Sequence, residues 1–344
     1  MKVFTPNYYG NFKCTADKCP DNCCIGWEID IDGAACEKYF SLSDDFGKIL
    51  SENITESEDG GYCFKLSEGD RCPFLNKNML CDIIINKGEE FLCEICDNHP
   101  RFHNCFGNVR ETGVGLACIE ATRLVLSCEE PMYLVESESG EGSIEVDYDE
   151  DFLKELFIVR KSLLEILQDR NKPISERLTE LLVKAESIQR SMENTVGENI
   201  TVSMPKVNCG NDLIGVLKNL EPLNDAWTEK INSLKISEEI MEKSSELMDE
   251  NPIIIEQTVV YFIFRHFLSS VYDGDILSKA KLSVLFCLAA VWLAVESDSF
   301  AKSFIEEVSI LSKEIEYSSE NMDALAELSR REDCFRTGNL ISVL

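Results

Sequence analysis

The sequence predicts a mainly α-helical protein in which a loop-rich, cysteine-containing N-terminal module precedes a helical bundle. Thirteen of the sixteen cysteines lie at or before Cys128, and apolar residues recur at helical spacing after Asp151. An acidic stretch rich in Ser and Gly separates the two parts. We therefore expect residues 1–130 to form the cysteine-rich module, 131–150 an acidic linker and 151–344 the helical domain.

Secondary-structure signals after the module are mostly helical. Helical spacing predicts helices over 152–168, 173–192, 252–272, 275–295, 301–315 and 321–331. A break is expected at Met204–Asp212, and the apolar run Leu282–Val295 is expected to be a buried core helix. Strand signals are few and short, at Cys81–Asn86 and Val109–Leu116.

The charge of the chain excludes some partners. A formal net charge of −30 argues against nucleic acid, because phosphate contacts need clustered Lys and Arg. It argues equally against docking on an anionic membrane. Two interpretations remain: charge that only keeps the protein soluble, and an acidic surface that attracts a lysine-bearing protein.

The interpretation of the cysteines depends on the cellular compartment, because the compartment sets whether thiols stay reduced. No apolar region typical of a signal peptide precedes Pro6, and Leu282–Val295 is shorter than the ~20 residues of a transmembrane helix. We therefore expect a cytoplasmic protein with no membrane partner. In that reducing compartment, dense cysteines favour metal binding or catalysis over a disulfide framework.

The cysteines of the module form groups that could bind metal. The groups are Cys14, Cys19, Cys23 and Cys24, then Cys72 and Cys81, then Cys93 and Cys96, with Cys118 following. Thiolates are soft ligands for zinc, Cu(I) and the iron of iron–sulfur clusters, and crowded thiolates repel one another unless a cation neutralises them. A thiol-rich core without metal is the alternative.

The spacing of the cysteines does not determine which metal they would bind. Structural zinc sites usually use two short Cys pairs, and here only Cys93 and Cys96 form one. The adjacent Cys23 and Cys24 cannot easily both bind one tetrahedral ion, whereas an iron–sulfur cluster accepts cysteines from scattered loops. The CxxxCxxC triplet is absent, since Gly26 stands where its third cysteine would be.

The flanking residues carry a resemblance to a known family. The CxxxxCxxxCC group at 14–24, "CPFL" at 72–75 with Cys81, and "CEICDNHPR" at 93–101 together resemble the cysteine-rich family described as zinc- or iron-chelating. The opening "YYGNFKC…CPDNCCIGWEIDID" at 8–32, followed by "GDRCPFLNKNMLCDIIINKGEEFLCEICDNHPR" at 69–101, is more specifically similar to flagellin lysine-N-methylases. The stretch 259–282 is similar to the helical C-terminal half of that family. The resemblance covers most of the chain, with specific motifs at the N-terminus and general ones after residue 150.

The resemblance implies methylation of flagellin lysines, with S-adenosylmethionine as donor and an iron–sulfur cluster of the 4Fe–4S kind. The cysteines that match its motifs are Cys19, Cys23, Cys24, Cys72, Cys81 and Cys96, with Cys14, Cys93 and Cys118 as additions. These exceed the four thiolates of one cubane. The cysteines outside the motifs are expected to be packing residues: Cys36, Cys63, Cys209, Cys287 and Cys334.

Catalytic residues and a donor pocket are not identified by the sequence. The glycines of "GNVRETGVGLAC" lack the G-x-G-x-x-G spacing of the common dinucleotide-type fold. Glu256, Arg265 and His266 fall on a predicted helix, where packing or solvation is the default. Three functions therefore compete: a lysine methylase, a non-catalytic zinc- or iron-chelating binding module, and an electron-transfer or redox-sensing protein.

Overall fold

The computed structural model describes residues 1–57, 60–140, 142–195 and 199–344. The chain forms two compact units. The cysteine unit comprises Phe12–Phe102 with Cys118–Glu120, and the helical unit comprises Met1–Asn11, His103–Ala117 and Ala121–Leu344. In sequence, the cysteine unit is thus an insertion into the helical unit. The expected module and linker boundaries at 130 and 150 differ from these divisions.

Short elements joined by loops build the cysteine unit. Its helices and 3-10 turns are η2 (Ala16–Lys18), α1 (Gly33–Ser41), α2 (Asp45–Glu52), α3 (Asp82–Lys87), η3 (Glu89–Phe91) and α4 (Glu94–Asn98). Its small sheet has the order β2 (Asp30–Ile31), β4 (Tyr62–Phe64) and β3 (Ile54–Glu56), and both pairs are antiparallel. Tyr39, Leu50, Phe64 and Phe74 fill the core beside this sheet.

Asp32 links two helices of the cysteine unit. Its side chain caps α1 by accepting the Ala35 N–H at 2.9 Å, and its other oxygen accepts the Glu94 N–H of α4 at 2.7 Å. Hydrogen bonds from Glu94 and Ala35 lower the pKa of Asp32, so the cap stays ionised at neutral pH. The cap therefore attaches the start of α4 to the start of α1.

A four-stranded sheet belongs mainly to the helical unit. Its order is β5 (Arg101–Phe106), β6 (Val109–Val114), β1 (Lys2–Pro6) and β7 (Leu134–Glu138). The N-terminal strand β1 pairs parallel to β6, with Lys2 opposite Val109, and antiparallel to β7, with Pro6 opposite Leu134. The first residues of the chain therefore occupy the interior of this sheet.

The rest of the helical unit is almost entirely helical. Its longer helices are α5 (Ile119–Leu126), α6 (Glu150–Leu167), α7 (Ile174–Met192), α8 (Lys206–Lys218), α9 (Asp225–Ser233), α10 (Glu238–Glu250), α11 (Pro252–His266), α13 (Ile276–Ala294), α14 (Phe300–Leu311) and α15 (Ser319–Arg331). The short pieces are η1 (Tyr9–Asn11), η4 (Phe267–Ser269), α12 (Ser270–Asp273), the π-helical turn η5 (Ser312–Glu316), η6 (Asp333–Phe335) and α16 (Thr337–Ser342).

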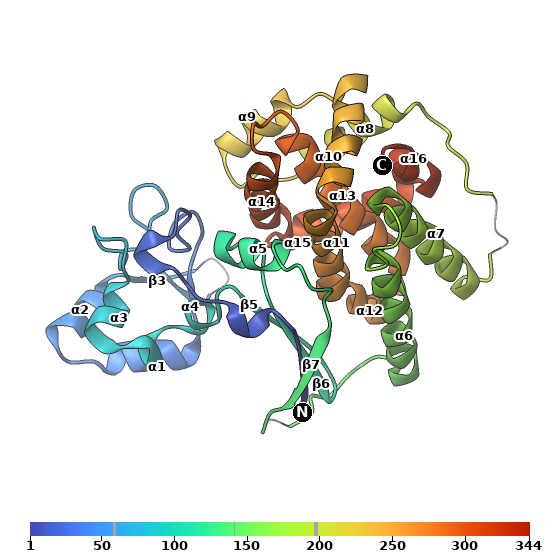
Figure 1. Cartoon of the computed structure of the whole chain (residues 1–344). Helices are drawn as coiled ribbons and strands as arrows, with labels where there is room; N and C mark the ends of the chain where they lie inside the picture. Colours follow the sequence, from blue (N-terminus) through green and yellow to red (C-terminus); the bar gives the residue numbers. More distant parts are fainter. Residues whose placement is uncertain (58–59, 141, 196–198) are drawn as a thin grey trace. The chain divides into compact units, whose positions relative to one another are not determined.

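Helix α13 is the centre of the helical unit. It packs against α7, α11, α14 and α15, and Figure 1 shows the orange-to-red helices gathered around α11 and α13 with the green α6 and α7 beside them. Asp275 begins the helix by accepting the Ser278 N–H at 2.9 Å. In the described part of the chain, α13 is the one helix long and apolar enough to cross a membrane, and 83% of that apolar window is buried inside the protein. The prediction of a buried core helix is confirmed.

Buried ion pairs connect α6 and α7 to the elements beside them. Arg160 of α6 donates from Nη1 to Glu111 of β6 at 2.7 Å, and both side chains are buried. Arg177 of α7 donates to Glu256 of α11 at 2.6 Å, and Arg170 donates to the same carboxylate at 2.8 Å. Removing one partner of such a pair leaves a buried charge uncompensated.

The C-terminal helix α16 packs closely against an earlier segment. A Cβ placed on Gly338 would lie 2.1 Å from the backbone oxygen of Thr201, so only glycine fits there. The next residue, Asn339, is fully buried and accepts the Ser203 N–H at 2.8 Å. Together these contacts attach the end of the chain to the segment before α8.

The prediction of a mainly helical protein is confirmed, and so is a strand at Val109–Val114. The strand predicted at Cys81–Asn86 is wrong: these residues form α3, with Asp82 in its first turn and Gly88 (φ 96°) ending it. The break predicted at Met204–Asp212 is wrong for most of its length, because α8 begins at Lys206 after Pro205. The expected linker 131–150 contains β7, and its residue Glu141 lies outside the described residues.

Candidate functional site

Backbone hydrogen bonds bring the cysteine-bearing loops of the cysteine unit together. The Cys72 N–H donates to the carbonyl of Cys24 at 2.8 Å, and the Gly26 N–H donates to the carbonyl of Asp70 at 3.0 Å. The indole of Trp27 donates to the carbonyl of Cys23 at 2.7 Å. The first and second cysteine groups, far apart in sequence, therefore lie side by side.

Arg71 shapes the loop that carries Cys72 and Cys81. Its guanidinium donates to the carbonyls of Leu75 at 2.9 Å and Asn76 at 2.8 Å. The loop returns to Cys81, which pairs with Leu75 through a β-bridge. Arg71 thus serves as a loop-forming residue that binds backbone oxygens of the loop and also the sulfur of Met79.

The thiols of the first two groups act on one another electrostatically. A hydrogen bond with Cys23 is the main cause that raises the pKa of Cys24, followed by burial and by the charges of Cys23, Cys72 and Cys81. Burial raises the pKa of Cys72 to about 11, and the charge of Cys81 adds to this. Burial also raises the pKa of Cys81, on which Cys23 acts as well.

The third group joins the same set. The Cys96 thiol donates to Cys93, which lowers the pKa of Cys93 and raises that of Cys96. The charges of Cys24 and Cys72 also raise the pKa of Cys96, so the third group lies within electrostatic reach of the other two. We call the following six side chains the thiol cluster: Cys23, Cys24, Cys72, Cys81, Cys93 and Cys96.

The thiol cluster can exchange protons for a cation. Each thiolate formed raises the pKa of the next thiol, so without a cation most of the cluster stays protonated. A bound metal reverses this, because its charge favours thiolates and displaces their protons. Among the described residues, no three His, Cys, Asp or Glu side chains converge as the ligands of a single ion would.

The other three predicted ligands lie differently. Cys14 is exposed and its sulfur accepts the Ala16 N–H at 3.4 Å, whereas the Cys19 thiol donates to the carbonyl of Asp21 at 3.1 Å. Cys118 is half-buried, and the segment Cys118–Glu120 belongs to the cysteine unit although the chain on either side of this segment belongs to the helical unit. The five cysteines expected to be packing residues are all buried: Cys36, Cys63, Cys209, Cys287 and Cys334.

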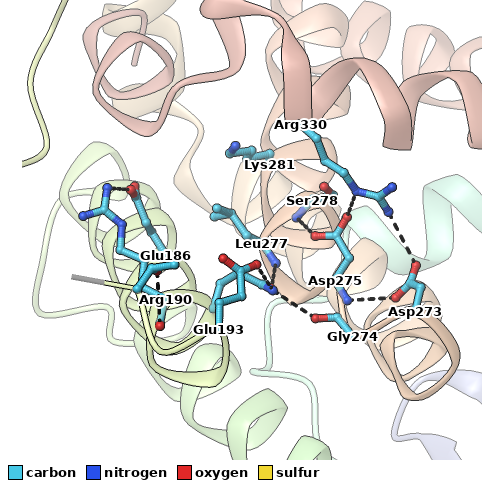
Figure 2. A pocket seen from close by; sticks show the side chains of 12 residues that line it. Glu186, Arg190, Glu193, Asp273, Gly274, Asp275, Leu277, Ser278, Lys281 and Arg330 are labelled. Carbon is cyan, nitrogen blue, oxygen red and sulfur yellow. Dashed lines mark hydrogen bonds and ion pairs between the residues drawn. The ribbon is translucent and has the colours of Figure 1, made fainter. Parts of the chain in front are cut away.

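The helical unit contains a polar cavity of about 480 Å³. Figure 2 shows side chains of α7 on one side and those of the α12–α13 loop and α15 on the other. Asp275 caps α13 and accepts from Arg330 at 2.5 Å, while the buried Lys281 donates to the Ser329 carbonyl at 3.1 Å. Burial lowers the pKa of Lys281. One oxygen of Glu186 is buried without a hydrogen-bond partner among the described residues. Helix capping and ion pairs account for most of this lining.

A second polar group lies where α11 ends. Of the three α11 residues noted in the sequence, Glu256 pairs with the arginines described above, whereas Arg265 and His266 both contact Glu316 of η5. The sequence did not identify Glu316. The side chain of Glu316 is fully buried in a helical turn, and no local sequence pattern indicates that a glutamate at this position is buried.

Comparisons with known proteins relate the C-terminal part of the helical unit to a protein family. Residues 208–343 match the family model described as the FliB lysine N-methylase C-terminal domain. The flagellar biosynthetic protein FliU of Salmonella muenchen is 30% identical over 144 residues, which cover 40% of this chain and 85% of that protein. The chain belongs to the flagellin lysine-N-methylase family.

Other members of this flagellin lysine-N-methylase family match over a shorter share of their length. Lysine-N-methylases of Salmonella choleraesuis and Salmonella typhimurium are each 27% identical over 141 residues, which cover 40% of this chain and 35% of those proteins. No solved structure matches the chain significantly. The family match lies over α8–α16 and contains the stretch 259–282, whereas the cysteine motifs that also indicated the family lie in the cysteine unit.

Proposed function

We propose that this protein transfers methyl groups from S-adenosylmethionine to lysine side chains of flagellin. The observation that carries the proposal is the match of residues 208–343 to the lysine N-methylase C-terminal domain. Methyl transfer needs a neutral amine aligned with the sulfonium carbon of the donor, and positioning supplies much of the rate. Flagellin as substrate draws support from the name of the FliU relative, which is a flagellar biosynthetic protein.

We further propose that the thiol cluster holds an iron–sulfur cluster, with zinc as the alternative. The donor set fits in kind and in number, because the cluster offers more than the four thiolates that a 4Fe–4S cluster requires. Among the described residues no three of these side chains converge as the ligands of a single ion would, so binding requires the loops to bring them together. When bound, such a cluster supplies redox-active iron. The chain itself supplies loops that hold Cys24 beside Cys72 and Cys93 beside Cys96. Cytoplasmic location belongs to this proposal, since thiols stay reduced there.

The charge of the protein suits a lysine-bearing substrate. With a net charge of −30, the surface attracts cationic segments and raises their local concentration, and this attraction weakens as salt screens it. Association with flagellin should therefore weaken as ionic strength rises. The same charge disfavours nucleic acid as a partner.

The test is a transfer assay with protein purified without oxygen. Flagellin and methyl-labelled S-adenosylmethionine are incubated with the protein, and labelled lysines are located by mass spectrometry. Flagellin with chemically acetylated lysines is the matched control and should take no label. Absence of label on unmodified flagellin, with the protein folded and metal-loaded, would sink the proposal.

A second candidate is a non-catalytic zinc- or iron-chelating module that docks a protein. One observation favours it: the matched region spans 35% of the length of the two lysine-N-methylases, so most of each enzyme has no matched counterpart here. This candidate predicts tight flagellin binding and bound metal but no methyl transfer. The transfer assay combined with metal analysis separates the two.

A further inference from the structure

Glu316 is the centre of a buried polar group in the helical unit. Its side chain is 0% exposed, and four donors from two elements converge on it. His266 Nε2 lies 2.6 Å and Arg265 Nη1 3.2 Å from Oε1, the Ser312 hydroxyl donates to Oε2 at 2.5 Å, and the Tyr261 hydroxyl lies 3.3 Å away. π-helical turns often occur at functional sites, and η5 supplies both Ser312 and Glu316.

The surroundings keep this carboxylate ionised. Burial alone would raise the pKa of Glu316, but the charge of Arg265 and hydrogen bonds from His266 and Ser312 outweigh it and lower the pKa. Burial lowers the pKa of His266, against the opposing effect of Glu316, so the imidazole is neutral at pH 7. A neutral imidazole carries one N–H, and an ionised carboxylate only accepts. The proton therefore lies on Nε2, and Nδ1 carries the lone pair.

The ring of His266 is fixed in orientation and partly exposed. Phe262, one turn earlier on α11, stacks on it with ring centroids 5.9 Å apart and an angle of 19°. The His266 side chain is 23% exposed, whereas Glu316 behind it is fully covered. Among the described residues, Nδ1 has no hydrogen-bond partner. A buried carboxylate that orients a partly exposed imidazole is the arrangement of a general base.

We propose that His266, oriented by Glu316, is the base that takes the proton from the substrate lysine before methyl transfer; this rests on the proposed function. The lysine ammonium gives one proton to Nδ1 and becomes a neutral amine. The amine lone pair then forms the N–C bond to the methyl group of the sulfonium donor. The C–S bond breaks and its electron pair stays on sulfur, which leaves as a neutral thioether. Glu316 stabilises the imidazolium until it loses the proton to water.

Other charges around His266 come from neighbouring elements. Arg265 of α11 and Lys279 of α13 disfavour the imidazolium, whereas Glu316 of η5 favours it. Lys279 is itself paired with Asp273 of α12 at 2.9 Å. The alternative interpretation is purely structural, with Glu316 serving only to attach η5 to α11. The two interpretations differ in how the rate depends on pH.

The decisive variant is His266→Gln. Its amide can still donate to Glu316, as Nε2 does, but it places no base at the position of Nδ1. We expect the transfer rate at pH 7 to fall by ~10²-fold or more, the usual contribution of a general base. The loss should shrink as pH rises toward ~10, where lysine deprotonates without help. The matched control is His103→Gln on β5, where Nδ1 of the imidazole lies 2.9 Å from the Thr112 hydroxyl.

Three outcomes would overturn the proposal: an unchanged rate at pH 7, a loss that is the same at every pH, or an equal effect in the His103 control. A second measurement does not depend on methyl transfer. The chain has three histidines, so ¹⁵N NMR of the imidazoles can assign His266 by its absence in His266→Gln. We expect a neutral Nε2–H tautomer at pH 7; a charged ring or an Nδ1–H tautomer contradicts the proposal. If the wild-type protein transfers no methyl group at any pH, the proposed function fails, and the NMR result still decides the protonation state.

Discussion

Glu314 should make the protein lose stability as pH rises, and its replacement by Gln should remove that loss. Glu314 lies in η5, is 3% exposed and accepts the Leu223 N–H at 2.8 Å. Burial raises the pKa of Glu314 from 4.5 to about 7. The unfolded chain releases the proton near pH 4.5, so the stabilising contribution is complete below that pH and is lost as pH rises through 7.

The magnitude follows from the two pKa values. The difference between about 7 and 4.5 is roughly 2.5 pH units, which corresponds to about 3 kcal/mol. Most of this stabilising contribution of Glu314 is lost between pH 5 and pH 8. A Gln at 314 keeps the shape and can accept the Leu223 N–H, and it carries no charge at any pH. We therefore expect Glu314→Gln to be about 2–3 kcal/mol more stable relative to wild type at pH 8 than it is at pH 5.

Urea unfolding followed by far-ultraviolet circular dichroism at pH 5, 6, 7 and 8 measures this difference. The exposed Glu246→Gln on α10 is the matched control and should show a flat difference from wild type. A Glu314→Gln difference that stays constant across this range would refute the reasoning, because it would mean that the buried carboxyl has its ordinary pKa.

Three further predictions concern the cysteines, a buried ion pair and a close backbone contact. Cys96→Ser should lower metal content and methyl transfer together, whereas Cys287→Ser in α13 should leave both nearly intact. The measurement is metal analysis per mole of folded protein. Equal losses of metal in the two variants would contradict the assignment of Cys96 as a ligand. Glu111→Ala should lower the free energy of unfolding by about 3–5 kcal/mol, because the substitution leaves the buried Arg160 without its partner. Urea titrations measure this difference, and a change below about 1 kcal/mol would contradict the prediction. Gly338→Ala should cost about 1–3 kcal/mol, because its methyl group meets backbone, and an unchanged melting temperature would show that α16 can shift.

Local signals in the sequence predicted part of the fold well. The start of α13 followed from Asp275 and the apolar run after it, because a cap and a long apolar segment act within a few residues. Pairing between distant segments could not be predicted in this way. The strand β7 lies in an acidic stretch and is a strand because β1, at the other end of the module in sequence, pairs with it. The six residues at Cys81–Asn86 include three consecutive isoleucines and suit either a strand or a helix, and in the structure α3 begins at Asp82 and ends before Gly88.

The candidate site also has parts that local sequence predicted and parts that it did not. Cysteine density indicated the six members of the thiol cluster, because residue type and spacing are visible in the chain, but it did not separate them from Cys14, Cys19 and Cys118. The partner of His266 was not visible, since Glu316 lies fifty residues later and its burial depends on tertiary packing. Sequence patterns identify side chains with unusual chemistry more readily than the residues that orient them.

The position of β1 also sets an order of events during synthesis. Lys2–Pro6 leaves the ribosome well before its parallel neighbour β6, which follows roughly a hundred residues later. All of Phe12–Phe102 is translated in between. The nascent thiols therefore emerge, and can meet a metal or an iron–sulfur carrier, before the first strand can find its place beside β6.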